Sequence, residues 1–256
     1  MKLISYKQNG NIKLGAFEEG KIYDLHALDG HIADNMLEFL QGGEEQLQLA
    51  MAAMEDGSPT ISAEDVELIS PVPNPPSVRD AYAFRQHVAT ARRNRGLEMI
   101  PEFDEIPIFY FTNHHAVFGE GYFPVLSRHT EKLDFELECA AVIGKGGRNI
   151  STSDADDYIA GFMIMNDLSA RVLQMQEMKL NLGPAKGKDF GSTFGPWLVT
   201  KDELESCKQS SVDGDRYDLK MKAFVNDIQV SGDTLSNMTW TFAQIIERVS
   251  YGVDIF

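Results

Sequence analysis

The sequence has few cysteines, since only Cys139 and Cys207 occur among its 256 residues. Neither belongs to a Cys-x-x-Cys pair or to a zinc-binding spacing, so the pattern excludes a disulfide framework and a structural zinc site of that kind. Such sparing use of cysteine is typical of proteins in a reducing compartment. We therefore expect the protein to be cytoplasmic.

The chain is also poor in positive charge, with 23 lysines and arginines against 39 aspartates and glutamates and a formal net charge of -16. No cluster of basic residues recurs on a regular period, so neither nucleic acid nor an anionic membrane surface is expected as a partner. No window reaches the roughly 18 apolar residues of a membrane span, and residues 1–8 lack the apolar core of a signal peptide. A small anionic substrate would need local cations or a metal ion to hold it.

The first 70 residues predict a small N-terminal β/α domain. Short strand-like runs are separated by Asn9-Gly10 and Glu19-Gly20, and Asn-Gly is a strong hairpin signal. Residues 71–76 are rich in proline and can continue neither a helix nor a central strand, so they predict an extended connector between domains 1–70 and 71–256. The elements expected before this connector are strands at residues 2–6, 12–17 and 21–24 and helices around residues 36–39 and 44–54.

The second domain is predicted to contain more strand than helix. Residues 80–95 favour a helix, and Asn226-Asp227 separates two apolar segments in the manner of a hairpin turn. The strands expected here cover residues 108–112, 135–143, 158–165, 197–200 and 219–225. The fold class that follows is α+β.

Two glutamates spaced two residues apart are the most informative feature of this domain. Residues 134–144 form an otherwise apolar, strand-like run, so Glu136 and Glu138 point to the same face of the predicted strand. Like charges held this close are destabilising unless one binds a proton or a cation lies between them. A hard divalent ion with oxygen ligands meets that need. A solvated acidic face on an edge strand is the alternative interpretation.

A third carboxylate, Asp167, ends the next apolar run, at residues 161–165. The chain is predicted to turn there into a helix, in which Arg171 and Gln174 follow Asp167 at positions i+4 and i+7. That spacing places an acid, a cation and an amide on one helical face. A salt bridge between Asp167 and Arg171 within the helix, worth about 0.3–0.5 kcal/mol, is the alternative.

Residues 186–197 form a glycine-rich loop that leads into a strand. Glycine lets backbone amides approach a ligand closely, and Lys188 would bring a point charge to a carboxylate or an oxyanion. The loop lacks the spacing of a phosphate-binding P-loop, and a plain surface turn is the alternative interpretation.

Residues 79–87 hold the fourth candidate group. Asp80, Phe84 and His87 are spaced i, i+4 and i+7, so the predicted helix would put an acid and an imidazole on one face. His87 is a candidate general base because imidazole takes up and releases protons near neutral pH. A surface histidine without a catalytic role is the alternative.

These four segments, in this order, resemble the fumarylacetoacetate hydrolase family across roughly residues 75–250. The strongest matches are residues 134–138, 166–171 and 187–193. The resemblance implies a mixed β-roll catalytic domain that binds Mg²⁺, or else Ca²⁺ or Mn²⁺, through two glutamates on one strand and an aspartate after another. The implied metal ligands are Glu136, Glu138 and Asp167.

Residues 79–87, with Arg85-Gln86-His87 intact, resemble the fumarylacetoacetase branch of that family. By this resemblance Asp80 joins the metal ligands and His87 activates a water molecule. The resemblance implies substrate contacts from Tyr82, Tyr110, Arg171, Gln174 and Lys188. The last three of these are also implied to take part in catalysis, where the two cations stabilise developing negative charge.

The predicted function is metal-dependent hydrolysis of a carbon–carbon bond in a small anionic 1,3-diketone or acylpyruvate, such as fumarylacetoacetate, in carbon catabolism. A divalent Lewis acid, a histidine base and two cations meet the needs of enolate chemistry. The alternatives are a decarboxylase, isomerase or hydratase on the same scaffold, and a catalytically silent member that binds metal or ligand. Since family members are commonly dimers, a homodimer is expected.

Two features depart from the family pattern. A distant glutamate pairs with the histidine in the fumarylacetoacetase branch, and a glutamate follows a lid histidine by three residues in the acylpyruvase-like branch, where this chain has Thr90. Family members usually continue through a Pro-Gly-Asp strand and a Gly-Thr loop beyond the segment that matches residues 250–256. The acid partner of His87 therefore has no candidate, and the catalytic domain is expected to be truncated or to lack its last strand.

Overall fold

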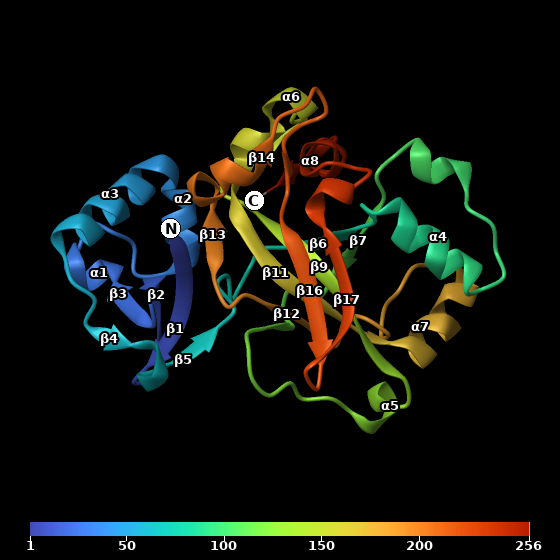
Figure 1. Ribbon diagram of the computed structural model, residues 1–256, viewed down its shortest axis with the longest axis horizontal. Helices are drawn as coiled ribbons and strands as arrows, with labels where there is room; N and C mark the ends of the chain where they lie inside the picture. Colours follow the sequence, from blue (N-terminus) through green and yellow to red (C-terminus); the bar gives the residue numbers. More distant parts are fainter. Residues whose placement is uncertain (256) are drawn as a thin grey trace.

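The computed structural model describes residues 1–255 and contains an N-terminal sheet with its helices beside a larger, strand-rich part (Figure 1). β1 (Lys2–Gln8), β2 (Asn11–Glu18) and β3 (Lys21–Asp24) form an antiparallel meander at the predicted positions. The first turn has φ values of 52° at Asn9 and 83° at Gly10, a left-handed conformation that asparagine and glycine adopt readily. The hairpin signal in the sequence is therefore confirmed.

Helices cover the N-terminal sheet on one side, at the left of Figure 1. Both helices expected here are present, and apolar side chains such as Leu25, Phe39 and Leu40 pack with Leu3 and Leu14 of the strands into one buried cluster. The elements of this segment are α1 (Leu25–Leu28), α2 (Met36–Gln41), α3 (Gly43–Asp56), β4 (Ile61–Ser62), η1 (Ala63–Asp65) and β5 (Glu67–Ile69).

The sheet continues across the predicted domain boundary. β1 pairs with β13 (Leu198–Thr200) as well as with β2, and β13 pairs with β11 (Ile159–Ala170), so ten of the described strands belong to one sheet. Gly161 of β11 permits this junction, since a Cβ atom there would contact the carbonyl oxygen of Val199. Residues 70–77 form neither helix nor strand, as their prolines predict, while the division into two domains stays a prediction.

The antiparallel pair of β9 (Leu133–Ile143) and β11 positions the candidate site. The register sets Glu138 opposite Met165 and Glu136 opposite Asp167. Directly opposed residues of an antiparallel pair point to the same face, so the three carboxylates share one face. The alternation expected for the glutamates is confirmed, because Leu137 and Cys139 point the other way and pack into a second apolar cluster.

That second cluster lies between the strands and the C-terminal helix α8 (Phe242–Ser250). The ring of Phe162 in β11 packs at a tilt against that of Phe242 with centroids 5.2 Å apart, and Ile246 and Val249 belong to the same cluster. Thr241 and Gln244 form a capping box at the start of this helix, which satisfies the backbone N–H groups that a helix leaves unpaired at its first turn. The core thus fixes β9 and β11 from the side opposite the carboxylates.

The remaining elements surround this core. The hairpin of β16 (Lys220–Val225) and β17 (Ile228–Thr234) crosses in front of β9 in Figure 1, and its turn has positive φ at Asn226 and Asp227, as predicted. The other elements are β6 (Val78–Ala81), α4 (Arg85–Arg93), η2 (Pro101–Asp104), β7 (Phe109–Thr112), β8 (Val117–Phe118), α5 (Ser127–Thr130), β10 (Gly147–Arg148), α6 (Thr152–Ala155), η3 (Asp156–Tyr158), α7 (Arg171–Glu177), η4 (Met178–Leu180), β12 (Ser192–Phe194), η5 (Lys201–Cys207), β14 (Lys208–Gln209), β15 (Arg216–Tyr217), η6 (Leu235–Asn237) and β18 (Asp254–Ile255).

The helix predicted over residues 80–95 is wrong in its first part. Asp80 lies in β6, where it pairs with Tyr110 of β7, and the helix begins only at Arg85, after Phe84 in an extended conformation. Asp80, Phe84 and His87 therefore do not share a helical face. Pairing with a strand about 30 residues later overrides the local pattern, which sequence periodicity alone does not reveal.

The helix expected to include Asp167 is also wrong at its start. β11 continues through Asp167 to Ala170, and α7 begins at Arg171. The i+4 spacing therefore spans a strand end, and Arg171 forms its ion pairs with Asp134 and Glu136 instead of Asp167. Among residues 1–255, no helix combines the length and the apolar content that crossing a membrane requires.

Candidate active site

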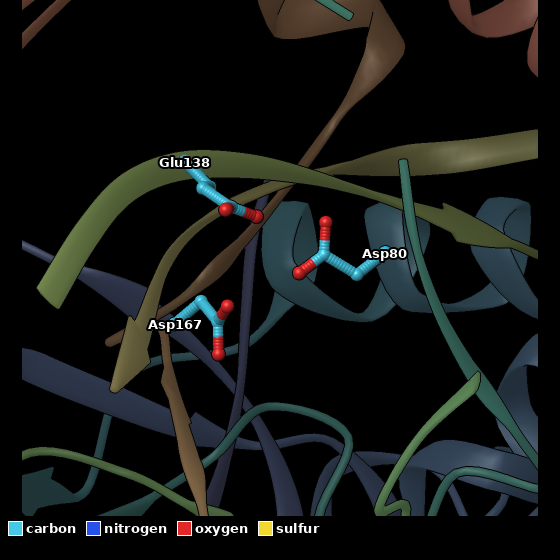
Figure 2. Close-up of side chains that lie close together, drawn as sticks. All are labelled: Asp80, Glu138 and Asp167. Atoms are coloured by element: carbon cyan, nitrogen blue, oxygen red, sulfur yellow. The ribbon is translucent and has the colours of Figure 1, made fainter. Parts of the chain in front are cut away.

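Three carboxylates from three strands meet at the centre of the molecule. Asp80 of β6, Glu138 of β9 and Asp167 of β11 each offer an oxygen atom, and these atoms all lie within 4.8 Å of one another (Figure 2). Asp80 is 8% exposed and Asp167 is 0% exposed, while Glu138 is half-buried. Three of the predicted metal ligands are thus brought together.

Burial and mutual repulsion make these carboxylates reluctant to ionise. Desolvation and the nearby charges of Asp80 and Asp167 raise the pKa of Glu138 well above its ordinary value. Desolvation, with Asp167 next in importance, raises the pKa of Asp80 to about 7. Desolvation also raises the pKa of Asp167. A cation among the three would remove this cost.

The donor set fits a hard divalent cation. All three groups present carboxylate oxygens, the ligands that Mg²⁺, Ca²⁺ and Mn²⁺ prefer. The Oδ1 atom of Asp167 is buried and accepts no hydrogen bond from any described residue. Buried polar atoms are almost always satisfied, so this oxygen is available to a metal ion.

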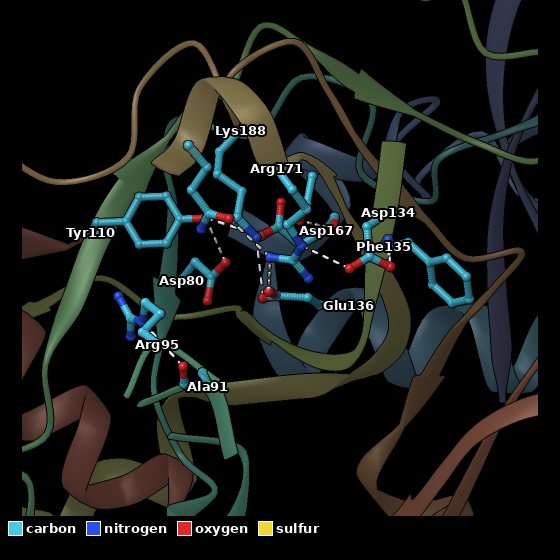
Figure 3. Close-up of polar contacts among 12 residues, drawn as sticks. Asp80, Ala91, Arg95, Tyr110, Asp134, Phe135, Glu136, Asp167, Arg171 and Lys188 are labelled. Carbon is cyan, nitrogen blue, oxygen red and sulfur yellow. Dashed lines mark hydrogen bonds and ion pairs between the residues drawn. The ribbon is translucent and has the colours of Figure 1, made fainter. Parts of the chain in front are cut away.

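Lys188 supplies a buried cation on one side of the carboxylates. Its side chain is 3% exposed, and its ammonium group contacts Asp167 and lies 3.1 Å from Glu136 Oε2 (Figure 3). Burial disfavours its charge, but Asp167 and Glu136 outweigh that effect and raise the pKa of Lys188. The side chain therefore stays an ammonium group.

Arg171, the first residue of α7, supplies a second cation directly after the end of β11. Its Nε lies 2.7 Å from Asp134 Oδ2 and its Nη1 lies 2.7 Å from Glu136 Oε1, and Nη1 also donates to Gln174 Oε1 at 3.0 Å. Although burial opposes ionisation of Glu136, Lys188 and Arg171 hold the pKa of that carboxyl group below its ordinary value. Glu136 thus faces the cations, and its predicted place among the metal ligands stays a prediction.

Tyr110 bridges two of the clustered carboxylates. Its hydroxyl group lies 2.8 Å from Asp80 Oδ2 and 3.1 Å from Asp167 Oδ2, within hydrogen-bond distance of both. Burial, followed by the charge of Asp80, raises the pKa of Tyr110, so the hydroxyl stays protonated. Tyr82 is 41% exposed and lies farther out, with its ring centroid 6.2 Å from that of His87.

His87 lies on α4 with an exposed side chain that faces the same cavity. No carboxylate of the described chain forms a hydrogen bond or ion pair with its imidazole. Thr90, three residues later on the same helix, also lines the cavity and provides no acid. The structure therefore identifies no orienting acid among residues 1–255.

The predicted site residues converge on one cavity of about 950 Å³. Asp167 lies beneath its lining, in contact with Lys188. The other predicted site residues line it directly: Asp80, Tyr82, His87, Tyr110, Glu136, Glu138, Arg171, Gln174 and Lys188. Residues far apart in the sequence, from Asp80 to Lys188, thus line one cavity, and their roles stay predictions.

Sequence reasoning missed two charged residues of this region. Asp134 binds Arg171, and strand alternation could have found it, because it precedes Glu136 by two residues on the same face. Arg95 follows α4 and donates from Nε to the carbonyl oxygen of Ala91 at 3.1 Å (Figure 3). Burial and the charge of Glu136 raise the pKa of Tyr82, whereas the charge of Arg95 lowers it.

Comparison with known sequences gives relatives over nearly the whole chain. A mitochondrial oxaloacetate tautomerase of Xenopus laevis is 27% identical over 260 residues, covering 100% of this chain and 76% of the relative. The oxaloacetate tautomerase YisK of Bacillus subtilis (strain 168) is 29% identical over 246 residues, covering 93% and 75%. Fumarylacetoacetase of Arabidopsis thaliana is 52% identical over 79 residues, which cover 30% of this chain and 18% of that protein.

Solved structures share the fold. A fumarylacetoacetate hydrolase from Exiguobacterium antarcticum superposes with a TM-score of 0.71 at 23% identity, over 100% of this chain and 83% of that one. A maleylpyruvate hydrolase from Sphingobium sp. SYK-6, in complex with manganese(II) and pyruvate, gives 0.72 at 23% identity, over 98% and 83%. The predicted α+β, strand-rich fold is confirmed.

A family model settles the classification. The model described as "Fumarylacetoacetate (FAA) hydrolase C-terminal" matches residues 77–255, which hold all three clustered carboxylates and the cations Lys188 and Arg171. The chain belongs to the fumarylacetoacetate hydrolase family.

Proposed function

We propose that the protein is a metal-dependent tautomerase that interconverts the keto and enol forms of a small 2-oxo dicarboxylate such as oxaloacetate. The observation that carries this proposal is the cluster of Asp80, Glu138 and Asp167 beside the ammonium group of Lys188. A divalent cation held by the three carboxylates would supply Lewis-acid polarisation of a ketone oxygen. Buried positive charge next to that oxygen stabilises an enolate.

The cations at the cavity wall suit a carboxylate-bearing substrate. Arg171 uses Nε and Nη1 for Asp134, Glu136 and Gln174, and its Nη2 donates to no described residue. The two carboxylates fix the orientation of the guanidinium group in advance, and Nη2 could donate to a substrate carboxylate. Arg171 would therefore bind and orient the substrate while Lys188 acts on the enolate oxygen.

His87 would move the proton between carbon and solvent. Tautomerisation requires a base that takes a proton from the carbon next to the ketone and returns it, and an exposed imidazole at the cavity can do both. Hydrolysis requires in addition that the base hold a water molecule in position, which an orienting acid assists. Tautomerisation, the isomerase alternative raised by the sequence, is supported by the relatives named oxaloacetate tautomerases.

The proposal is tested by following oxaloacetate from its enol form. We expect the ultraviolet absorbance of the enol to decay faster with protein and Mg²⁺ or Mn²⁺, and EDTA to remove the acceleration. Product analysis should recover intact oxaloacetate. The relatives named oxaloacetate tautomerases, at 27% and 29% identity over at least 93% of the chain, support this choice of substrate. An unchanged rate with metal-loaded protein would reject the tautomerase proposal.

Carbon–carbon hydrolysis of an acylpyruvate is the second candidate. The cavity also reaches apolar side chains such as Met163 and Met165, which suits a longer acyl group. Fumarylacetoacetate and simple acylpyruvates belong in the same assay. Metal-dependent loss that yields two fragments would establish hydrolysis, whereas metal binding without turnover of any compound would identify a silent binder.

We further propose Mg²⁺ as the resident ion, with Mn²⁺ or Ca²⁺ as substitutes, a homodimeric assembly and a cytoplasmic location. The oxygen-only donor set supports the hard cation but does not rank these three. Metal titration by calorimetry ranks them, and sedimentation of the metal-loaded protein measures the assembly.

Replacing His87 by alanine should separate turnover from metal binding. We expect kcat to fall by about 10²-fold, the usual contribution of a general base, while affinity for Mn²⁺ stays within about twofold. His87 is not among the clustered carboxylates, so the metal site should persist. The matched control is His31→Ala, because His31 lies in the N-terminal part and its side chain is 88% exposed. Unchanged turnover in His87→Ala would assign the proton transfer to another group.

A further inference from the structure

The loop that carries Lys188 is held by a side chain to which no role has been assigned. The carboxylate of Glu177, the last residue of α7, accepts hydrogen bonds from three successive backbone N–H groups. Oε2 accepts from Ala185 at 2.9 Å and from Gly187 at 3.1 Å, and Oε1 accepts from Lys186 at 2.6 Å. We propose that Glu177 is a positioning residue that clamps this loop and thereby aims Lys188 at Glu136 and Asp167.

The clamp acts on the backbone immediately before Lys188. The carbonyl oxygen of Ala185 accepts from the backbone N–H of Lys188 at 2.9 Å and of Asp189 at 2.8 Å, so the turn starts at a residue that Glu177 holds. The carbonyl oxygen of Gly187 accepts from Ala170 N at 2.8 Å, at the end of β11. The peptide unit before Lys188 is thus fixed on both sides.

Gly187 brings the loop directly against α7. A Cβ atom at this position would lie 2.6 Å from Gln174 N and 2.7 Å from Gln174 Cα, closer than van der Waals contact permits. The absence of a side chain therefore lets the loop reach the carboxylate of Glu177. The sequence alone suggested that this glycine makes room for a ligand, whereas in the structure it allows close contact with the helix.

One short helix therefore organises the cationic side of the cavity. Arg171, Gln174 and Glu177 follow one another at intervals of three residues on α7, so they lie along one side of the helix. The first two line the cavity, and the third lies outside the lining and reaches it only through the loop. A carboxylate that accepts three N–H bonds gains charge-assisted hydrogen bonds that a neutral residue cannot reproduce.

Hydrogen exchange tests the clamp without any assay of activity. The probe is deuterium uptake by metal-free protein in peptides that cover residues 181–190, for the wild type, Glu177→Gln, Glu177→Ala and the control Gln176→Ala. Gln176 is the exposed neighbour of Glu177 on the same helix. We expect exchange at amides 185–187 to accelerate by about tenfold or more in Glu177→Ala, less in Glu177→Gln, and not in the control. Equal protection in all four proteins overturns the clamp.

Turnover tests the link to Lys188, and this arm depends on the proposed function. With the substrate that the wild type turns over, we expect kcat of Glu177→Gln to fall by about 10²-fold, the loss that follows a displacement of about 1 Å, with KM changed less than threefold. A variant with faster loop exchange and an unchanged kcat overturns the positioning role. If the wild type turns over nothing, the proposed function fails, while the exchange data still decide the clamp.

Discussion

Replacement of Glu138 by alanine is expected to abolish metal binding and turnover together. Glu138 contributes one of the three oxygens that lie within 4.8 Å of one another, and the other two come from different strands that cannot move toward the gap without breaking sheet hydrogen bonds. Calorimetric affinity for Mn²⁺ should fall by more than about 10²-fold, since even the loss of residues around a metal ligand costs 10–100-fold. Turnover should fall to the background rate.

Thermal unfolding adds a second readout for Glu138→Ala. In the wild type, Mn²⁺ at 100 times its dissociation constant should stabilise the fold by about 2.7 kcal/mol, and this stabilisation should vanish in the variant. Without metal the variant should be no less stable, because it lacks one of three mutually repelling carboxylates. The control is Glu45→Ala, an exposed carboxylate of α3. A metal-induced stabilisation that survives in Glu138→Ala would place the ion elsewhere.

Local patterns were sufficient to predict two of the three strands that carry the site, β9 and most of β11, but not β6, where Asp80 was expected in a helix. Alternation along residues 134–144 correctly put Glu136 and Glu138 on one face, because both faces of a strand are defined by the backbone alone. The family resemblance, and not the pattern, supplied Asp80 and Asp167 as partners of Glu138. The proximity of these residues depends on pairing between distant strands, which no local pattern contains.

What sequence reasoning missed depends on long-range contacts. The i+4 spacing of Asp167 and Arg171 looked helical, but β9 extends the strand conformation of β11 to Ala170 by pairing along its whole length. The side chain of Arg171, which follows the end of the strand, therefore points toward Asp134 and Glu136. Glu177 had no sequence signal, because its partners are backbone N–H groups, which every residue except proline possesses. Contacts between a side chain and a backbone eight to ten residues away appear only in the fold.

Replacement of Lys188 by methionine is expected to have the second largest effect. The substitution keeps an unbranched side chain, one heavy atom shorter, and removes the ammonium group that contacts Asp167 and Glu136. Because Lys188 is 3% exposed and Asp167 is 0% exposed, water does not replace the lost charge. Breaking a buried ion pair by removing one partner costs about 3–5 kcal/mol. We expect a loss of this size in the free energy of unfolding of the metal-free protein.

Metal should restore part of that stability but not the activity. A divalent cation at Asp80, Glu138 and Asp167 would neutralise the carboxylate that Lys188 no longer contacts, so Mn²⁺ should raise the melting temperature of Lys188→Met more than that of the wild type. Turnover should stay about 10²–10³-fold below the wild type even with saturating metal, because the charge proposed to stabilise the enolate is missing. Chemical denaturation and steady-state kinetics measure the two effects separately.

Lys186→Met is the matched control, since it removes an ammonium group from the same loop. Lys186 pairs with Asp189 at 2.8 Å, but its side chain is 69% exposed, and exposed pairs contribute about 0–1 kcal/mol. We expect near-wild-type stability and turnover in this variant. If Lys188→Met matched it in both measurements, the buried ammonium group would be neither a structural nor a catalytic requirement. If only the turnover of Lys188→Met fell, the carboxylates would have compensated by binding a proton, and lowering the pH should then stabilise the variant relative to the wild type.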